Sequence, residues 1–119
     1  MRYAMVIMES DVEQREAEAE AGRRSEAERD FDALVRWWAD LRARGKIAAS
    51  ARLASAPVAN VTWRGQQPIL TDGPYVEAKE SVAGFAILDV ETEGEVRDIA
   101  ASWPGRAGTR IELRRVVER

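Results

Sequence analysis

The sequence predicts an α+β protein of the ferredoxin-like, split βαβ type with an added β-hairpin. The main observation is the order of apolar segments along the chain: strand, helix, strand, hairpin, strand, helix, strand. A second is size, because 119 residues with 45% hydrophobic content suit one core and not two. We therefore expect residues 1–119 to form a single domain.

The first strand–helix–strand unit contains the clearest helix. Residues 2–8, RYAMVIM, are dense in apolar side chains and predict a buried strand. The charged segment 11–24 lacks an apolar face and predicts either a solvated helical turn or a mobile insertion. A capping box, Ser25 with Glu28, then opens a helix that Gly45 is placed to end. Its apolar stripe has helical spacing and comprises Phe31, Leu34, Val35, Trp38 and Leu41, with Trp37 at its edge, either on the margin of the core or facing a partner.

Residues 46–54 predict a strand with unusually small inward side chains: Ile47, Ala49, Ala51 and Leu53. Small residues leave room either for a closely packed helix, which we favour, or for a cavity. A hairpin is expected at 61–71, where the segments VTWR and PILT flank GQQ.

The second unit begins with SVAGFAILDV at 81–90, whose continuous apolar run predicts a strand buried on both faces. Thr92 and Glu95 form another capping box, and Pro104 with Gly105 ends the helix that follows. The inner stripe of that helix is Val96, Ile99, Ala100 and Trp103. The last strand, TRIELRRVV, alternates Thr109, Ile111 and Leu113 with Arg110, Glu112 and Arg114.

This topology has a consequence for assembly. Both helices must cover the same face of the sheet, so the other face is left bare although it is apolar at Phe85 or Ala86, depending on register. A bare apolar sheet face is usually covered by a partner. A symmetric homodimer, packed sheet on sheet, is the simplest arrangement.

Composition excludes several functional classes. The chain has no cysteine and no histidine, which rules out thiolate chemistry, Ser-His-Asp triads and histidine-ligated metal or haem at its own positions. We expect no metal and no cofactor, and any acid–base chemistry must use Asp, Glu, Lys or Tyr. The net charge of −3 argues against nucleic acid as a partner. No apolar run suits a membrane span or a signal sequence, so a cytoplasmic protein is expected.

The stretch TDGPYVEAKE at 71–80 resembles the signature Asp-Gly-Pro-Phe-Ala-Glu-Thr-Lys-Glu of the YCII-related, or DGPF-domain, family of small bacterial proteins. RYAMVIM, GFAILDVET and RIELRRV resemble the family's other strands, so the likeness covers nearly the whole chain. It departs from the signature at Tyr75, Val76 and Ala78.

The resemblance implies a dimeric α/β-barrel made of two ferredoxin-like subunits. It implies no single function. Many members are encoded beside extracytoplasmic-function sigma factors, and a distant branch includes a dehydrochlorinase that uses a His–Asp pair. That mechanism cannot be transferred to a chain without histidine.

The same stretch admits three interpretations. The structural one is a turn, because Gly73 permits φ > 0 and Pro74 fixes the next φ. In the second, the stretch is the wall of a small-molecule pocket, with ligand-binding candidates Asp72, Gly73, Pro74, Tyr75, Glu77, Lys79 and Glu80. The third is catalysis, with Asp72 or Glu77 as weak candidates for the base.

Two functional hypotheses follow. The first is a small homodimeric binding or accessory protein, linked through the family's gene context to a sigma-factor circuit. The alternative is a carboxylate-dependent lyase or isomerase acting on a small aromatic or polar substrate. Without histidine or cysteine, the sequence favours the binding protein over the enzyme.

Overall fold

The computed structural model describes residues 1–10, 24–54, 57–73, 80–105 and 108–118, with backbone only at 24–30 and 80. The elements follow the predicted order. They are β1 (Arg2–Ser10), α2 (Arg24–Ala43), β2 (Ile47–Arg52), β3 (Ala59–Arg64), β4 (Gln67–Asp72), β5 (Glu80–Asp89), α3 (Glu93–Ala101) and β6 (Thr109–Arg115). The charged segment 11–24 lies outside the described residues except for Arg24, the first residue of α2.

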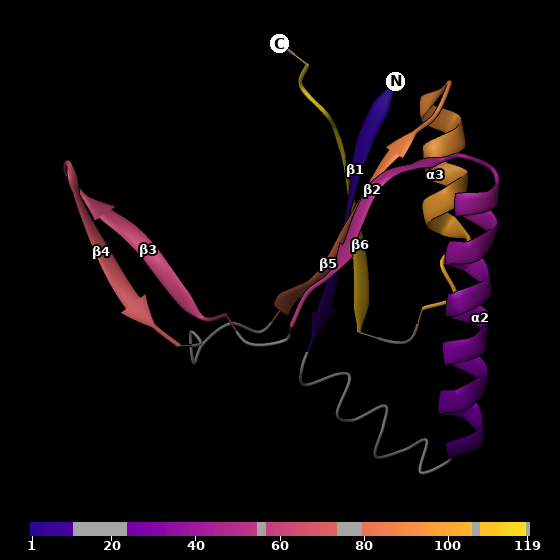
Figure 1. Ribbon diagram of the computed structural model, residues 1–119, viewed down its shortest axis with the longest axis horizontal. Helices are drawn as coiled ribbons and strands as arrows, with labels where there is room; N and C mark the ends of the chain where they lie inside the picture. The colour runs from indigo at the N-terminus through magenta and orange to yellow at the C-terminus, as the bar shows by residue number, and fades with distance from the viewer. Residues whose placement is uncertain (11–23, 55–56, 74–79, 106–107, 119) are drawn as a thin grey trace.

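Four strands form one antiparallel sheet in the order β2-β5-β1-β6. Each strand–helix–strand unit crosses one intervening strand, and right-handed crossovers place both helices on the same face. Figure 1 shows α2 and α3 together on one side of the sheet. The predicted ferredoxin-like α+β fold is confirmed.

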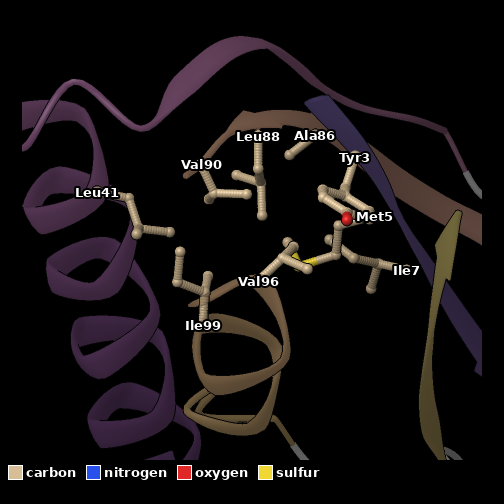
Figure 2. Packing of buried hydrophobic residues seen from close by; sticks show 9 residues of the cluster. All are labelled: Tyr3, Met5, Ile7, Leu41, Ala86, Leu88, Val90, Val96 and Ile99. Atoms are coloured by element: carbon tan, nitrogen blue, oxygen red, sulfur yellow. The ribbon is translucent and has the colours of Figure 1, made fainter. Parts of the chain in front are cut away.

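The core lies between this face and the helices (Figure 2). Alternate residues of each strand point into it, as the two-residue period of a strand requires. The buried residues are Tyr3, Met5, Ile7, Leu41, Ala86, Leu88, Val90, Val96 and Ile99. All come from β1, β5 and the two helices or lie next to these elements.

The C-terminal end of α2 is fixed by its backbone. Gly45 has φ +69, and the N–H groups of Gly45 and Lys46 donate to the carbonyls of Arg42 and Leu41, both at 3.0 Å. These two bonds form a Schellman motif, in which glycine adopts the left-handed conformation without steric cost. The predicted end of the helix at Gly45 is confirmed.

The apolar stripe of α2 is only partly buried. Leu41 is 2% exposed, whereas Phe31 is 57% and Val35 is 50% exposed. The predicted apolar stripe is thus buried at Leu41 and exposed in its N-terminal half. The physical reason is that the described residues leave a hollow beneath this half of the helix.

A β-bulge changes the faces of β2. Ile47 pairs with Leu88, but Ala49 pairs with Ile87, so one extra residue lies between them. Directly opposed residues share a face, so Ile47 points toward the helices while Ala49 and Ala51 point to the open face. The expectation that all of these residues point one way is wrong because a bulge reverses the alternation.

The strand β5 is buried on one face only within this chain. Gly84, Ala86 and Leu88 are buried under the helices, whereas Phe85 and Ile87 are half-buried on the open face. The expectation of burial on both faces therefore fails for the single subunit. The register does place Phe85, not Ala86, on the open face, opposite Val6.

The open face combines an apolar area with a charged border. Its apolar side chains are Ala4, Val6, Met8, Ala49, Ala51, Val82, Phe85 and Ile87. Along β6, Glu112 accepts from Arg114 at 2.6 Å and lies 3.8 Å from Arg110. These residues alternate with Ile111 and Leu113 as predicted, since residues two apart in a strand share a face.

The β3–β4 hairpin stands away from the sheet, on the side opposite the helices (Figure 1). Its two-residue loop begins at Gly65, with φ +64, as a type II′ turn requires. Cross-strand pairing places Val61, Trp63, Pro68 and Leu70 on one face, and all four are exposed. The predicted hairpin is confirmed, and it presents an uncovered apolar face.

The N-terminus of α3 is capped as predicted. The Thr92 hydroxyl accepts from the Glu95 N–H at 3.1 Å, and the Glu95 carboxylate accepts from the Glu91 N–H at 3.2 Å. The Lys46 ammonium lies 2.6 Å from the same carboxylate. The hydrogen bond that the Lys46 ammonium donates has the largest effect on the Glu95 carboxyl, and the one from the Glu91 N–H comes next. Both lower its pKa from the ordinary value of 4.5.

Neither described helix is both long and apolar enough to cross a lipid bilayer.

We expect Glu95→Gln to weaken the dependence of the melting temperature on pH in the acidic range. The lowered pKa of Glu95 means that its stabilisation is present above the unfolded pKa near 4.5 and is lost as pH falls through the folded value. The variant should melt below the wild type at about pH 7, and the two should converge toward about pH 3. Thermal unfolding followed by circular dichroism measures this. Glu93→Gln, which removes an exposed pair with Arg97, is the matched control and should show a smaller gap; an equal gap for both variants would contradict the assignment.

We expect Tyr3→Phe to leave the free energy of unfolding unchanged or to raise it by up to about 1 kcal/mol. The Tyr3 hydroxyl is buried in the core and has no hydrogen-bond partner among the described residues (Figure 2). Removing it relieves a desolvation cost without leaving a cavity. Urea unfolding measures the change, with Met5→Ala as a control expected to lose about 2–5 kcal/mol. A loss above about 1 kcal/mol in Tyr3→Phe would show that the hydroxyl makes a stabilising contact.

Candidate functional site

A cavity of about 920 Å³ lies between α2 and the edge of the sheet formed by β2 and β5. Its size falls within the range of small-molecule sites. The lining comes from β1, α2, β2 with the two residues that follow it, the start of β5, and Trp103, two residues beyond the end of α3. The described lining residues are Ile7, Glu9, Phe31, Leu34, Val35, Trp38, Arg42, Ser50, Ala51, Arg52, Leu53, Ala54, Ser81, Ala83, Gly84 and Trp103.

The side chains on the floor of the cavity are small, so they leave space between the sheet and α2. Ser50, Ala83 and Gly84 lie where larger residues would fill the space under α2. Gly84 has a second role, because a Cβ at this position would come within 2.8 Å of the Ala51 carbonyl oxygen. Glycine therefore allows β2 to approach β5 closely and leaves the sheet surface flat at this point.

Three tryptophans form an aromatic cluster, and two of them line the cavity. Trp37, Trp38 and Trp103 contact one another edge to face, with ring centroids 5.0, 5.0 and 5.8 Å apart. The Trp37 indole N–H donates to the Ser102 hydroxyl at 2.9 Å, and that hydroxyl donates to the Ile99 carbonyl at 2.7 Å. Trp38 and Trp103 thus face the cavity from a braced cluster, while Trp37 lies on the margin of the core.

Among the described lining residues, three are charged: Glu9, Arg42 and Arg52. The Arg42 guanidinium lies 5.9 Å from the Trp38 ring centroid, a cation–π distance. Arg52 forms no ion pair or hydrogen bond with any residue in the described parts of the chain. The site therefore combines an extended apolar and aromatic surface with a small number of cationic groups.

The structure shows only part of the stretch 71–80. Asp72 ends β4 opposite Ala59 and is exposed. Gly73 has φ +86, its N–H donates to the Val58 carbonyl at 3.0 Å, and its carbonyl accepts from the Asn60 amide at 3.2 Å. The predicted positive φ at Gly73 is thus observed, and these bonds close the base of the hairpin.

The other candidates of this stretch are located less fully. Pro74, Tyr75, Glu77 and Lys79 lie outside the described residues, and Glu80 is described only as the first residue of β5. Among the described lining residues of the cavity, Ser81 follows this stretch directly, whereas Asp72 and Gly73 are not included. The roles of the seven predicted ligand-binding residues stay predictions.

The groups that line this cavity are of kinds that can bind a small molecule. Its lining offers aromatic faces, two guanidinium groups, one carboxylate and two serine hydroxyls. Within the described ranges, no group of three or more Asp or Glu residues is placed to hold a metal ion. An amphipathic small molecule is the ligand class that matches such a lining.

Sequence reasoning missed this cavity, although one signal pointed to it. The small residues of 46–54 indicated either close helix packing or a cavity, and we favoured close packing. The structure instead has a hollow over Ser50 and its neighbours. The cavity also depends on Phe31 and Trp38, which the sequence analysis placed on the apolar stripe of the helix.

Comparison with known proteins agrees with the fold. A search of curated proteins gave no match. The family model for the YCII-related domain matches residues 1–118, nearly the full length of the chain. On that match, the chain belongs to the YCII-related domain family.

Proposed function

We propose that this chain forms a homodimeric binding protein whose small-molecule ligand occupies the cavity between α2 and the β2–β5 edge. The observation that carries the proposal is the cavity itself, at about 920 Å³, with Trp38 and Trp103 in its wall. Pockets of this size that combine apolar walls with few polar groups are the usual location of small ligands. The braced tryptophan cluster keeps this wall in place before a ligand arrives, which reduces the entropic cost of binding.

The uncovered apolar surfaces support the homodimer. On the open face, Val6, Phe85 and Ile87 form a continuous apolar area bordered by the Arg110–Glu112–Arg114 ladder. Apolar centres with charged rims are typical of protein interfaces. Two copies packed face to face about 10 Å apart would bury this area symmetrically.

The hairpin adds a second reason for a partner. An isolated two-stranded hairpin is at best marginally stable in water. Trp63 and Leu70 are 66% and 67% exposed on it. Because the hairpin lies on the open side of the sheet (Figure 1), a second subunit seated there would be positioned to cover these side chains.

The carboxylate-dependent enzyme remains the alternative. Asp72 is exposed at the base of the hairpin, and Glu77 lies outside the described residues. No observation on the described part of the chain favours catalysis over binding. The link to a sigma-factor circuit and the cytoplasmic location likewise stay predictions from the sequence and the family resemblance.

We expect Ser50→Phe to abolish binding of Nile red, a neutral apolar dye, to the cavity. Ser50 lines the cavity from the edge strand, so a phenyl ring there fills the space without burying a polar group. Dye fluorescence measures binding, which should weaken at least tenfold. Ala48→Phe is the matched control, since Ala48 is on the same strand and is exposed outside this lining. Equal dye binding by both variants would overturn the cavity as the binding site.

We expect the wild type to have twice the 13.3 kDa mass of one chain, and Phe85→Asp to have the single-chain mass. A carboxylate at Phe85 would be desolvated at the centre of the proposed interface, which costs several kcal/mol (about 2–7 for a polar group). Size-exclusion chromatography with light scattering measures both masses. Phe31→Asp introduces the same charge at an exposed position on the helix side and should stay dimeric. A monomeric wild type, or a dimeric Phe85→Asp variant, would contradict sheet-on-sheet pairing.

A further inference from the structure

We propose that the ligand of the cavity is a monocarboxylate with an elongated apolar or aromatic body, and that Arg52 binds its carboxylate. This inference rests on the binding function proposed above and specifies its ligand. It depends on the position of Arg52, on the lack of a described partner for it, and on the distribution of the other charges.

Arg52 is placed on the helix-facing side of the sheet. It pairs with Gly84 on β5, and Gly84 pairs with Ile7 on β1, whose side chain is buried under the helices. Directly paired residues share a face, so Arg52, Gly84 and Ile7 form one row beneath α2. Gly84 has no side chain and lets β2 approach β5 closely, and both Arg52 and Gly84 line the cavity.

The Arg52 guanidinium has no ion pair or hydrogen bond with the residues that the structure describes. A guanidinium presents a planar fork of donors that matches a carboxylate in two parallel hydrogen bonds. An inward-pointing charge on an edge strand can also serve only to prevent strand pairing between molecules. The two roles differ in one measurable respect, because only the first discriminates an acid from its neutral analogue.

The other charges indicate one carboxylate and not two. Arg42 is in the last turn of α2, which a tight turn joins to the start of β2, whereas Arg52 ends β2. The two arginines therefore lie toward opposite ends of β2, a strand that spans about 16 Å. Glu9 lies two residues beyond Ile7 on the same face and lines the same end of the cavity as Arg52. Its negative charge disfavours a second anionic group beside the first.

The surface between the two arginines suits an apolar body. Leu34 and Trp38 cover the cavity from α2, and Trp103 closes one side. Arg42 is already stacked near Trp38, which lessens its availability as the anchor. A ligand whose carboxylate meets Arg52 would lay its apolar part along this wall.

The test compares three probes of one shape: 4-phenylbutyrate, its neutral amide and 4-phenylbutylamine. Displacement of Nile red from the full-length protein gives each affinity. We expect the acid to bind at least about tenfold more tightly than the amide. In Arg52→Gln this preference should fall to about twofold or less, and Arg52→Lys should retain part of it. Arg64→Gln, on the exposed hairpin, is the matched control and should leave the preference unchanged.

Each other outcome has a definite meaning. Equal affinity for acid and amide, or no displacement by the acid while Nile red stays bound, overturns the carboxylate and leaves the binding function intact. Preference for the amine overturns it in favour of recognition at Glu9. Loss of the preference in Arg42→Gln but not in Arg52→Gln overturns the assigned anchor. The proposed function itself fails separately, if Ser50→Phe does not reduce Nile red binding. Circular dichroism of each variant confirms that it is folded.

Discussion

Both helices lie on one face of the four-stranded sheet, and the rest of the structure depends on this asymmetry (Figure 1). The core can form only on the covered face, so every buried strand residue belongs to one of the two alternating rows. The opposite row on the central strands β1 and β5 includes Val6 and Phe85, so it is also apolar although neither helix covers it. A fold of this type thus leaves an apolar surface uncovered within the chain wherever its second face is not polar.

The cavity follows from a mismatch between the two helices on the covered face. The helix α2 has 20 residues and α3 has 9, so they are about 30 and about 14 Å long. Beyond the end of α3 at Ala101, no described helix accompanies the N-terminal half of α2. The small residues of β2 and β5 below this half do not fill the space. The exposed Phe31 and Val35 and the hollow beneath them have the same cause.

The sequence predicts the features that local chemistry decides. The Thr92 cap, the Gly45 helix end and the turn at Gly65 were predictable because each depends on a few neighbouring residues. The reversal of faces in β2 was not, because a bulge depends on how the strand pairs with β5. The cavity was also hidden, since it requires α2, β2 and Trp103 to be assembled first. For residues 71–80 the structure adds the conformation of Gly73, and the remaining candidates rest on sequence alone.

The hairpin interrupts the connection between β2 and β5, which are already neighbours in the sheet. In a plain ferredoxin-like chain these two strands need only a short link. None of the buried core residues belongs to β3 or β4. Substitutions in Val61, Trp63 or Leu70 therefore leave the core of the subunit untouched. The hairpin can therefore vary in sequence without changing the residues that pack the two helices against the sheet.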